Sequence, residues 1–346
     1  MRGDSTSSME IRKVQMTGGS SYVISLPKTW IKAMNIKKND PLGVVTQSDG
    51  SLVVTTRISG EQTKTTKVFD IDHIDHVKEP NYLYRYLIGA YIAGYANIKI
   101  KSSTGIPPFV RMGVRKFTQM TIGQEVVEEA QDQIILKDLL NPAEMPFDNT
   151  IKRMHILVNG MHSDAMAALV KKEPTLAEDV ISRDNDVNRL HWLIARQHNI
   201  VSKNMNLAAK MDLSVESVGY YYLISRILER MGDHAVIIAR YVPNLIAKRM
   251  DKEIVESLTS SSEMALKIFN KSMDTFYSKD VRLANQNIES VTELIRMCDE
   301  AESLAQQHKG ILAVSVGYIT ESIRRTGEYS ADLSEQVINY VIGEQD

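Results

Sequence analysis

The chain of 346 residues has a net charge of −2, with 43% hydrophobic and 24% charged residues. This composition excludes a disordered or fibrous chain and predicts a folded protein with two or three domains. Cys298 is the only cysteine, so no intrachain disulfide can form and a reducing compartment such as the cytoplasm fits best. Residues 1–8 form no apolar run, and the most apolar stretch, 86–95, is too short to span a bilayer. We therefore expect a disordered N-terminal tail, no signal peptide and no membrane insertion.

Basic residues are concentrated near the N-terminus. Residues 1–57 contain eight Lys or Arg and four Asp or Glu, so the remainder of the chain is acidic. This balance suits an anionic partner, although a solvated surface of the same charge is nearly as common. Charge alone therefore leaves both interpretations open.

Short β-forming runs dominate the N-terminal segment. Its expected elements are a strand at 21–26, a helix at 29–34 and strands at 43–46 and 52–55. Asp49-Gly50 lies between the last two strands, and Asp-Gly between two β-rich runs predicts a hairpin. Fewer than 60 residues with such short strands bury little surface, so we expect a second chain or another domain to complete the core.

Residues 25–40, SLPKTWIKAMNIKKND, resemble the signature of the AbrB-like swapped-hairpin domain. In that signature an apolar residue followed by Pro-Lys opens a short helix that ends in Leu-Gly-Ile-Lys-x-Gly-Asp. Proteins of this family interleave hairpins from two chains into one small barrel, so the resemblance implies a homodimer. Many members also bind DNA, which makes DNA an expected partner.

Basic residues at matching positions are the DNA-binding candidates that this resemblance implies. They are Arg12 and Lys13 on the first strand, with Lys28 and Lys32 at the helix start. Two positions depart from the pattern, because Ile31 stands where many DNA-binding members carry arginine and Asn39 replaces the usual glycine. Dimerisation without DNA contact therefore stays open as an alternative.

Residues 63–147 mix both hydrophobic periods and predict a small α+β connecting domain. The expected elements are strands at 67–71, 97–101 and 134–136 and helices at 82–95 and 109–123. Residues 70–76 place five potential metal ligands in seven residues. On a strand these side chains would face opposite ways, so we favour a solvated turn over a metal site at His73 and His76.

The remaining residues, 148–346, have a helical pattern almost throughout. Turn signals separate six expected helices at 148–171, 175–204, 214–241, 252–277, 280–308 and 311–342. They divide into two three-helix repeats, 148–243 and 251–342. The repeats are weakly similar when Gly232 is aligned with Gly327, which indicates an internal duplication.

Two acidic motifs in the first repeat predict a metal site. Glu229 and Asp233 are four residues apart on one helix, and Asp184 and Asn188 have the same spacing on another. If the helices pack side by side, four oxygen side chains converge, a set that favours Mg, Ca, Mn or Fe over Zn. The alternative is an ordinary solvated face in which Arg230 pairs with Asp184.

Neighbouring residues modify this prediction. His234 and Asp186 are outlying candidate ligands beside the four-residue set. In the second repeat Arg324 aligns with Glu229, which puts a cation where a ligand would belong. We therefore expect at most one metal site, in the first repeat.

Residues 227–235, ILERMGDHA, and 184–190, DNDVNRL, resemble motifs of the PhoU family over roughly 148–342. The resemblance implies a negative regulator of phosphate uptake, a metal-binding acidic motif in some members, and contact with the ATPase of a phosphate ABC transporter. Together with the AbrB-like segment it also resembles archaeal phosphate-uptake regulators, which implies coupling to transcription.

These resemblances imply a multidomain fold. Its expected parts are a tail at 1–8, an AbrB-like swapped-hairpin β domain at 9–58, the α+β domain at 63–147 and an all-α PhoU-like domain at 148–346.

Three functions follow from these patterns. The first is a homodimeric, DNA-binding regulator of phosphate uptake, and the second is an adaptor that inhibits a transporter ATPase without binding DNA. The third, a bundle metalloenzyme, is disfavoured because the chain lacks paired Glu-x-x-His elements, a Ser-His-Asp grouping and a phosphate loop. We therefore expect no enzyme and no organic cofactor.

Overall fold

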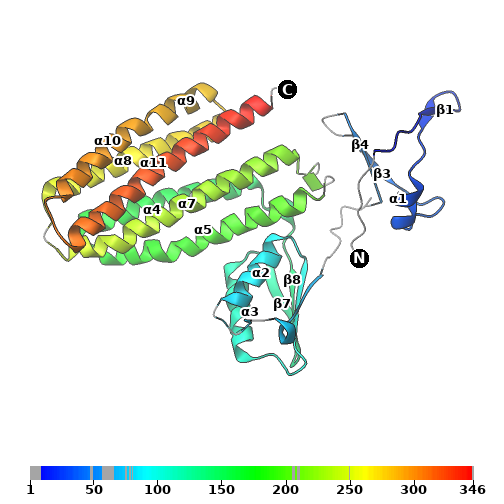
Figure 1. Cartoon of the computed structure of the whole chain (residues 1–346), viewed down its shortest axis with the longest axis horizontal. Coiled ribbons are helices and arrows are strands. Elements are labelled where there is room, and N and C mark those ends of the chain that lie inside the picture. Colours follow the sequence, from blue (N-terminus) through cyan, green and yellow to red (C-terminus); the bar gives the residue numbers. More distant parts are fainter. Residues whose placement is uncertain are drawn as a thin grey trace. The chain divides into compact units, whose positions relative to one another are not determined.

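The computed structural model describes residues 9–46, 50–56, 66–74, 76–77, 79, 81–204, 207–208, 211–248 and 250–344. The chain divides into two compact units, Met1–Glu61 and Gln62–Asp346. The first unit is β-rich, and the second contains an α+β domain followed by a helical domain (Figure 1). This arrangement confirms the predicted multidomain fold class. The tail at 1–8 lies outside the described residues, and the finer domain boundaries stay predictions.

The first unit consists of two separate hairpins and one short helix. Its elements are β1 Gln15–Thr17, β2 Ser21–Val23, α1 Lys28–Ala33, β3 Gly43–Thr46 and β4 Leu52–Thr55. Strands β3 and β4 pair antiparallel with Val44 opposite Val54, as the sequence predicted. Ser48 and Asp49 of the turn lie outside the described residues, whereas Gly50 has a φ of 77°, which suits glycine in a hairpin turn.

Two expectations for the first unit are wrong in extent. The strand predicted at 21–26 ends at Val23, and Arg12 and Lys13 precede β1 instead of lying on it. The β1–β2 ladder runs only from the Gln15–Val23 pair to the Thr17–Ser21 pair. Residues beyond these pairs have no strand partner among the described residues, and an extended segment without a ladder is not a strand.

The α+β domain has one mixed sheet with helices packed on it. Its main elements are β5 Thr66–Asp70, α2 Tyr82–Ile92, β6 Asn97–Lys101, α3 Pro108–Met120, β7 Gln124–Glu129 and β8 Gln133–Asp138. The strand order is β5-β6-β8-β7, with β5 parallel to β6 and the other pairs antiparallel. Alternate strand residues such as Ile98, Ile100 and Leu136 are buried against Leu87 and Phe117 of the helices.

The segment after β5 is a local turn, in agreement with the favoured interpretation. Asp70 pairs with Lys101 at 2.8 Å and caps the 3₁₀-helix η1 Ile71–His73. Asp72 accepts hydrogen bonds from the Ser103 backbone N–H at 2.6 Å and the Ser102 hydroxyl at 2.7 Å. These bonds, the backbone one foremost, lower the pKa of Asp72 to about 2. Both carboxylates therefore have partners within the turn and the adjoining strand and loop.

The helical domain contains two bundles that share one hydrophobic core. Its helices are α4 Phe147–Lys171, α5 Pro174–Val201, α7 Val215–Ile246, α8 Lys252–Ser278, α9 Val281–Glu289, α10 Val291–Ala305 and α11 Ile311–Gly343. The first bundle contains α4, α5 and α7, and the second contains α8 to α11 (Figure 1). The bundles pack mainly through α7 against α11 and through α4 against α8. No described helix is long and apolar enough to cross a membrane.

Two helices differ from the sequence prediction. The helix expected at 280–308 is interrupted at Ser290, whose hydroxyl donates to the Gln286 carbonyl four residues earlier at 3.1 Å and so competes with the helical ladder. Helix α7 continues through Pro243, where a turn was expected, and ends at Ile246. Proline has no N–H to donate to the Ala239 carbonyl, and the helix ends within one turn after it.

A buried ion pair joins the α+β domain to the first bundle. Arg196 of α5 is 2% exposed, and its Nε donates to Asp138 Oδ2 at 3.0 Å. Its guanidinium also donates to the carbonyl oxygens of Tyr91 and Tyr95. Asn199, one turn further along α5, donates to the Ile92 carbonyl at 3.0 Å. The C-terminal end of α2 is therefore tied to α5.

Candidate cation site on the first repeat

Helices α5 and α7, which carry the predicted ligands, approach closely at Gly232. A Cβ atom built on Gly232 would lie 3.4 Å from Val187 Cγ1. A Cβ atom would thus make an ordinary van der Waals contact with Val187, which shows how close the two helices are at this point. The approach places Glu229 and Asp233 of α7 near Asp184 of α5, so that the three charges influence one another.

The carboxylates of Asp184, Glu229 and Asp233 share one half-buried space. Burial raises the pKa of each above its ordinary value, and the charge of Asp233 raises the pKa of Asp184 and Glu229 further. Asn188 Nδ2 donates a hydrogen bond of 3.0 Å to Asp184 Oδ2. Like charges that face one another across a partly dry space are destabilising, and a bound cation would relieve them.

Glu229 provides the observation that fits a cation. Its side chain is 17% exposed, and its buried Oε2 atom has no hydrogen-bond partner among the described residues. Arg230 Nε lies 3.9 Å from this oxygen, and the alternative Arg230–Asp184 pair does not occur among the ion pairs of the described residues. An unsatisfied carboxylate oxygen beside two further carboxylates is a donor set that hard cations prefer.

The four side chains do not form a finished metal cage. Across the described ranges, no three His, Cys, Asp or Glu side chains come together closely enough to hold a metal ion. The metal site at Asp184, Asn188, Glu229 and Asp233 therefore stays a prediction. These residues would hold a cation through their oxygen atoms, and the cation would supply positive charge between α5 and α7.

The two outlying candidate ligands, His234 and Asp186, contact other side chains. The His234 ring packs against Tyr329 of α11, with ring centroids 5.7 Å apart, and burial lowers the pKa of His234. Asp186 forms an ion pair of 3.6 Å with Arg189, one turn further along α5. Both side chains therefore have other neighbours than the acidic cluster.

Sequence reasoning missed two arginines beside the acidic cluster. Arg226 and Arg240 lie seven residues before and after Asp233, so all three share one face of α7. The charge of Arg226 lowers the pKa of Glu229 and Asp233, and that of Arg240 lowers the pKa of Asp184 and Asp233. The seven-residue spacing is the signal that would have found them.

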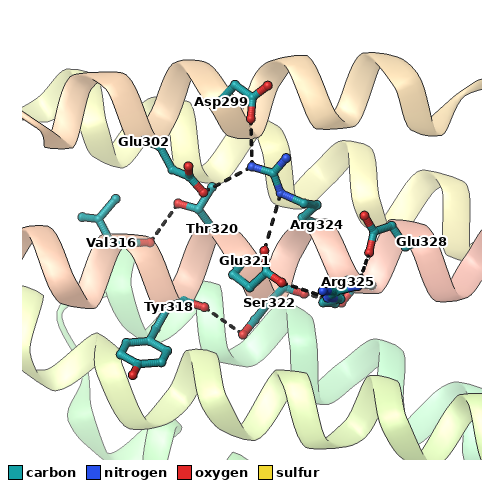
Figure 2. Close-up of polar contacts among 11 residues, drawn as sticks. Asp299, Glu302, Val316, Tyr318, Thr320, Glu321, Ser322, Arg324, Arg325 and Glu328 are labelled. Carbon is teal, nitrogen blue, oxygen red and sulfur yellow. Dashed lines mark hydrogen bonds and ion pairs between the residues drawn. The ribbon is translucent and has the colours of Figure 1, made fainter.

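The corresponding face of the second repeat is neutralised by an arginine (Figure 2). Arg324 of α11 takes the position that Glu229 has in the first repeat. Its Nη2 lies 2.9 Å from Asp299 and 3.2 Å from Glu302 of α10, and its Nε lies 3.6 Å from Glu321. A guanidinium between three carboxylates neutralises this face, whereas the arginines beside the first cluster form no ion pair with it shorter than 3.9 Å among the described residues.

The second repeat keeps the glycine of the first. Gly327 lies where α11 approaches α10, and a Cβ atom built on it would collide with Leu294 Cδ2. The two aligned glycines therefore both face a neighbouring helix of their own bundle, more tightly in the second repeat than in the first.

The DNA-binding candidates are exposed side chains of the first unit. Lys28 and Lys32 are one turn apart on α1 and share a face. Arg12 forms an ion pair with Glu10, and Lys13 follows it in the segment before β1. Their contact with DNA stays a prediction.

The fold and this site define a class of protein in which a small β-rich unit precedes a tandem of three-helix bundles with one acidic face. Family models match both parts: residues 151–242 match the PhoU domain, and residues 15–62 match MazE, the antidote-toxin recognition domain of a bacterial antitoxin. The chain therefore carries a PhoU domain behind an N-terminal domain of the MazE and AbrB-like type.

Relatives and solved structures resemble the part of the chain that contains the PhoU domain. A phosphate-specific transport system accessory protein PhoU homolog of Clostridium acetobutylicum is 22% identical, over 58% of this chain and 95% of the relative. PhoU homolog 1 of Thermotoga maritima, which bears the same description, is 24% identical over 54% of this chain and 82% of its own length. The crystal structure of PhoU from Pseudomonas aeruginosa has a TM-score of 0.51 at 19% identity and covers 57% of this chain and 96% of the PhoU chain. That of the phosphate transport system regulatory protein PhoU from Streptococcus pneumoniae has a TM-score of 0.50. These structures support the fold of the helical domain.

Proposed function

We propose that the chain is a homodimeric regulator of phosphate uptake that binds DNA through its first unit and uses the PhoU domain as a sensor or partner platform. The similarity to phosphate-specific transport accessory proteins, which extends over nearly their whole length, carries the phosphate-uptake part of this proposal. Those relatives are named as accessory proteins and not as enzymes, so no catalytic activity is proposed.

The homodimer is supported by the apolar surface of the first unit. None of its described residues, 9–46 and 50–56, is buried. Several large apolar side chains are at least 60% exposed, namely Met9, Ile11, Tyr22, Val44 and Leu52. Removing such surface from water stabilises a protein by roughly 25 cal/mol per Å², and two hairpins that do not pair with each other cannot provide the cover. Hairpins of a second copy would complete the core.

DNA binding is supported by the exposed cations of the first unit. Arg12, Lys13, Lys28 and Lys32 would each neutralise a DNA phosphate, and a dimer would present the set twice. Binding of this kind weakens steeply as salt is raised, because condensed counterions are released when the complex forms.

The test is a gel shift of the full chain on DNA upstream of its own gene and of phosphate-transport genes, across a salt series and with and without phosphate. Lys28→Gln with Lys32→Gln should weaken binding and lower the salt slope by about 0.9 for each DNA phosphate that is no longer neutralised. Lys37→Gln with Lys38→Gln removes the same charge from exposed positions outside α1 and serves as the control. Equal effects of the two double variants would contradict the assigned interface.

The adaptor function is the alternative, and two observations favour it. Ile31 is half-buried in α1, where the resemblance places arginine in many DNA-binding members, and the Arg12 guanidinium is already paired with Glu10. In this case the first unit only dimerises, and the helical domain binds a phosphate-transporter ATPase. Absence of a gel shift at low salt, together with capture of that ATPase by the full chain, would establish the adaptor.

A cation at the acidic face completes the proposal. Asp184, Asn188, Glu229 and Asp233 would hold a Mg, Mn, Fe or Ca ion and so link α5 to α7. The orphaned Glu229 Oε2 and the raised pKa values of the three carboxylates support it.

A further inference from the structure

Strand β5 is an edge strand whose outer side is open. It pairs with β6 on one side and ends the sheet on the other. Among the described residues, no strand or loop backbone pairs with the outer edge of Thr66–Asp70. An open edge presents a row of unpaired N–H and C=O groups, which is a template for one more strand.

An open cavity of about 440 Å³ lies against this edge, and we call it the β5–α2 cleft. Its β5 side is formed by four consecutive residues, 67–70, and its α2 side by Arg85, Tyr86 and Gly89, with Ala93 directly after the helix. Successive strand residues point to opposite faces, so a cavity that touches four in a row also meets the backbone edge of the strand. The α2 residues recur at helical spacing and therefore form one face of the helix.

The cleft has aromatic walls and a floor of small residues. Tyr86 is 45% exposed and meets Phe69 edge-on, with ring centroids 5.9 Å apart. A Cβ atom built on Gly89 would meet no atom within 4 Å, so there is free space at the floor. Val68, which lies on β5 itself, is 47% exposed. This combination suits an aliphatic side chain that enters between the strand and the helix.

The charge of the cleft favours an anionic occupant. Lys67 Nζ lies 5.7 Å from the ring centroid of Phe69 and 6.0 Å from that of Tyr95. Neither Lys67 nor Arg85 has an ion-pair partner among the described residues. The Asp70 carboxylate, which also lines the cleft, is engaged by Lys101 at 2.8 Å. Two cations therefore stay available for a carboxylate on the occupant.

We propose that the β5–α2 cleft binds an extended acidic peptide segment of a partner protein, which adds to β5 as a further strand. Backbone hydrogen bonds to the alternate residues of β5 that face its open edge would hold the segment, and alternate aliphatic side chains would enter the cleft. A carboxylate of the segment would meet Lys67 or Arg85. This peptide site is separate from the DNA and cation sites of the proposed function.

The cleft is connected to the PhoU domain through contacts between α2 and α5. Helix α2, which forms one wall, is held at its C-terminal end by Arg196 and Asn199 of α5. The same α5 carries Asp184 and Asn188 of the acidic face. A captured partner would therefore be held on the same compact unit as the acidic face.

The test uses heptapeptides displayed on phage and selected on the immobilised full chain, then synthesised with a fluorescein label for anisotropy. We expect sequences with alternating aliphatic residues and at least one Asp or Glu. Gly89→Leu fills the floor and should weaken their binding more than about 10-fold, and Lys67→Gln should weaken it roughly 3- to 10-fold. Gly113→Leu is the control, because Gly113 is also helical with open space at its Cβ but lies on α3, outside the cleft.

Backbone methylation separates strand addition from simple pocket binding. N-methyl groups on alternate peptide residues remove the N–H donors that would pair with β5, and they should abolish binding. The proposal is overturned if selection yields no peptide, if the peptides bind Gly89→Leu as tightly as the unmodified chain, or if N-methylation has no effect. Enrichment of basic peptides would also contradict the assigned charge.

Discussion

The two three-helix repeats both have a glycine where their third helix faces a neighbouring helix, and they differ in the charge of the residue one turn before it. In both repeats a glycine on the third helix, Gly232 or Gly327, allows close approach to a neighbouring helix. One turn before the glycine, the first repeat carries Glu229 with an unsatisfied oxygen, whereas the second carries Arg324 between three carboxylates. Packing has thus stayed similar while the electrostatics have diverged.

This difference separates two roles for the same surface. An arginine that links α11 to α10 stabilises the second repeat through its own ion pairs, and it leaves no place for a cation. In the first repeat, Glu229 has an unsatisfied oxygen and the carboxylates repel one another, which should destabilise the fold slightly and would favour a bound cation.

The largest expected effect concerns the anchorage of the first repeat. Arg196→Met should lower the free energy of unfolding by about 3–5 kcal/mol, because it leaves the Asp138 carboxylate buried without its partner. Thermal or urea unfolding of the full chain measures this loss. Arg189→Met on the same helix removes a partly exposed ion pair and should change stability by no more than about 0.5 kcal/mol. Equal losses of stability in the two variants would show that the buried Arg196–Asp138 pair stabilises the chain no more than an exposed pair does.

A smaller effect is expected within the second repeat. Arg324→Met removes the cation shared by Asp299, Glu302 and Glu321, and it should lower the free energy of unfolding by roughly 1–2 kcal/mol, since the carboxylates remain partly solvated. The loss should shrink at high salt, which screens the repulsion left behind. Urea unfolding at two salt concentrations would detect both changes. An unchanged midpoint would mean that the arginine does not stabilise the bundle.

The smallest effect has the opposite sign in the two repeats. Glu229→Gln should raise the free energy of unfolding by a few tenths to about 1 kcal/mol in the absence of metal, because it relieves a screened repulsion. Glu328→Gln, at the position of the second repeat that corresponds to Asp233, breaks an ion pair of 2.8 Å with Arg325 and should lower the free energy of unfolding slightly. Chemical unfolding of the two variants measures these changes. A change of the same sign in both variants would contradict the proposed difference in electrostatics between the repeats.

The pH dependence follows from the raised pKa values. In the folded chain Asp184, Glu229 and Asp233 hold their protons to higher pH than in the unfolded chain. Their contribution therefore favours folding at low pH and is lost as pH rises through the folded pKa values, starting from the ordinary values of 3.8 and 4.5. In Glu229→Gln this part of the pH dependence should become weaker.

Much of the fold was predictable from local patterns. Apolar residues at helical spacing predicted the ends of most long helices to within a few residues, and Asp49-Gly50 predicted the β3–β4 hairpin. Strand β7 was missed because its sequence, QEVVEE, exposes mostly polar residues and has little apolar alternation. The break at Ser290 depends on one side-chain hydrogen bond, which no periodicity reveals.

The residues of the candidate cation site were predictable from the sequence, but their burial and hydrogen bonding were not. Four-residue spacing placed Glu229 beside Asp233 on one helix and Asp184 beside Asn188 on another, since helical geometry is regular, but it left open whether the two helices meet. That Glu229 would keep an unsatisfied oxygen, and that Arg196 would bury its charge against Asp138, depends on contacts between segments far apart in the chain. Such contacts have no local sequence signal.

A cation site in the first repeat alone is tested most directly by the metal content of the purified full chain, measured by mass spectrometry after exposure to Mn²⁺. We predict that metal is retained by the chain and lost when Glu229 and Asp233 are both replaced by alanine, with the dimer intact. A control variant of the second repeat, with Glu321 and Glu328 of α11 replaced by alanine, should retain it. Unchanged metal content in the first variant, or equal loss in both, would contradict a site confined to the first repeat.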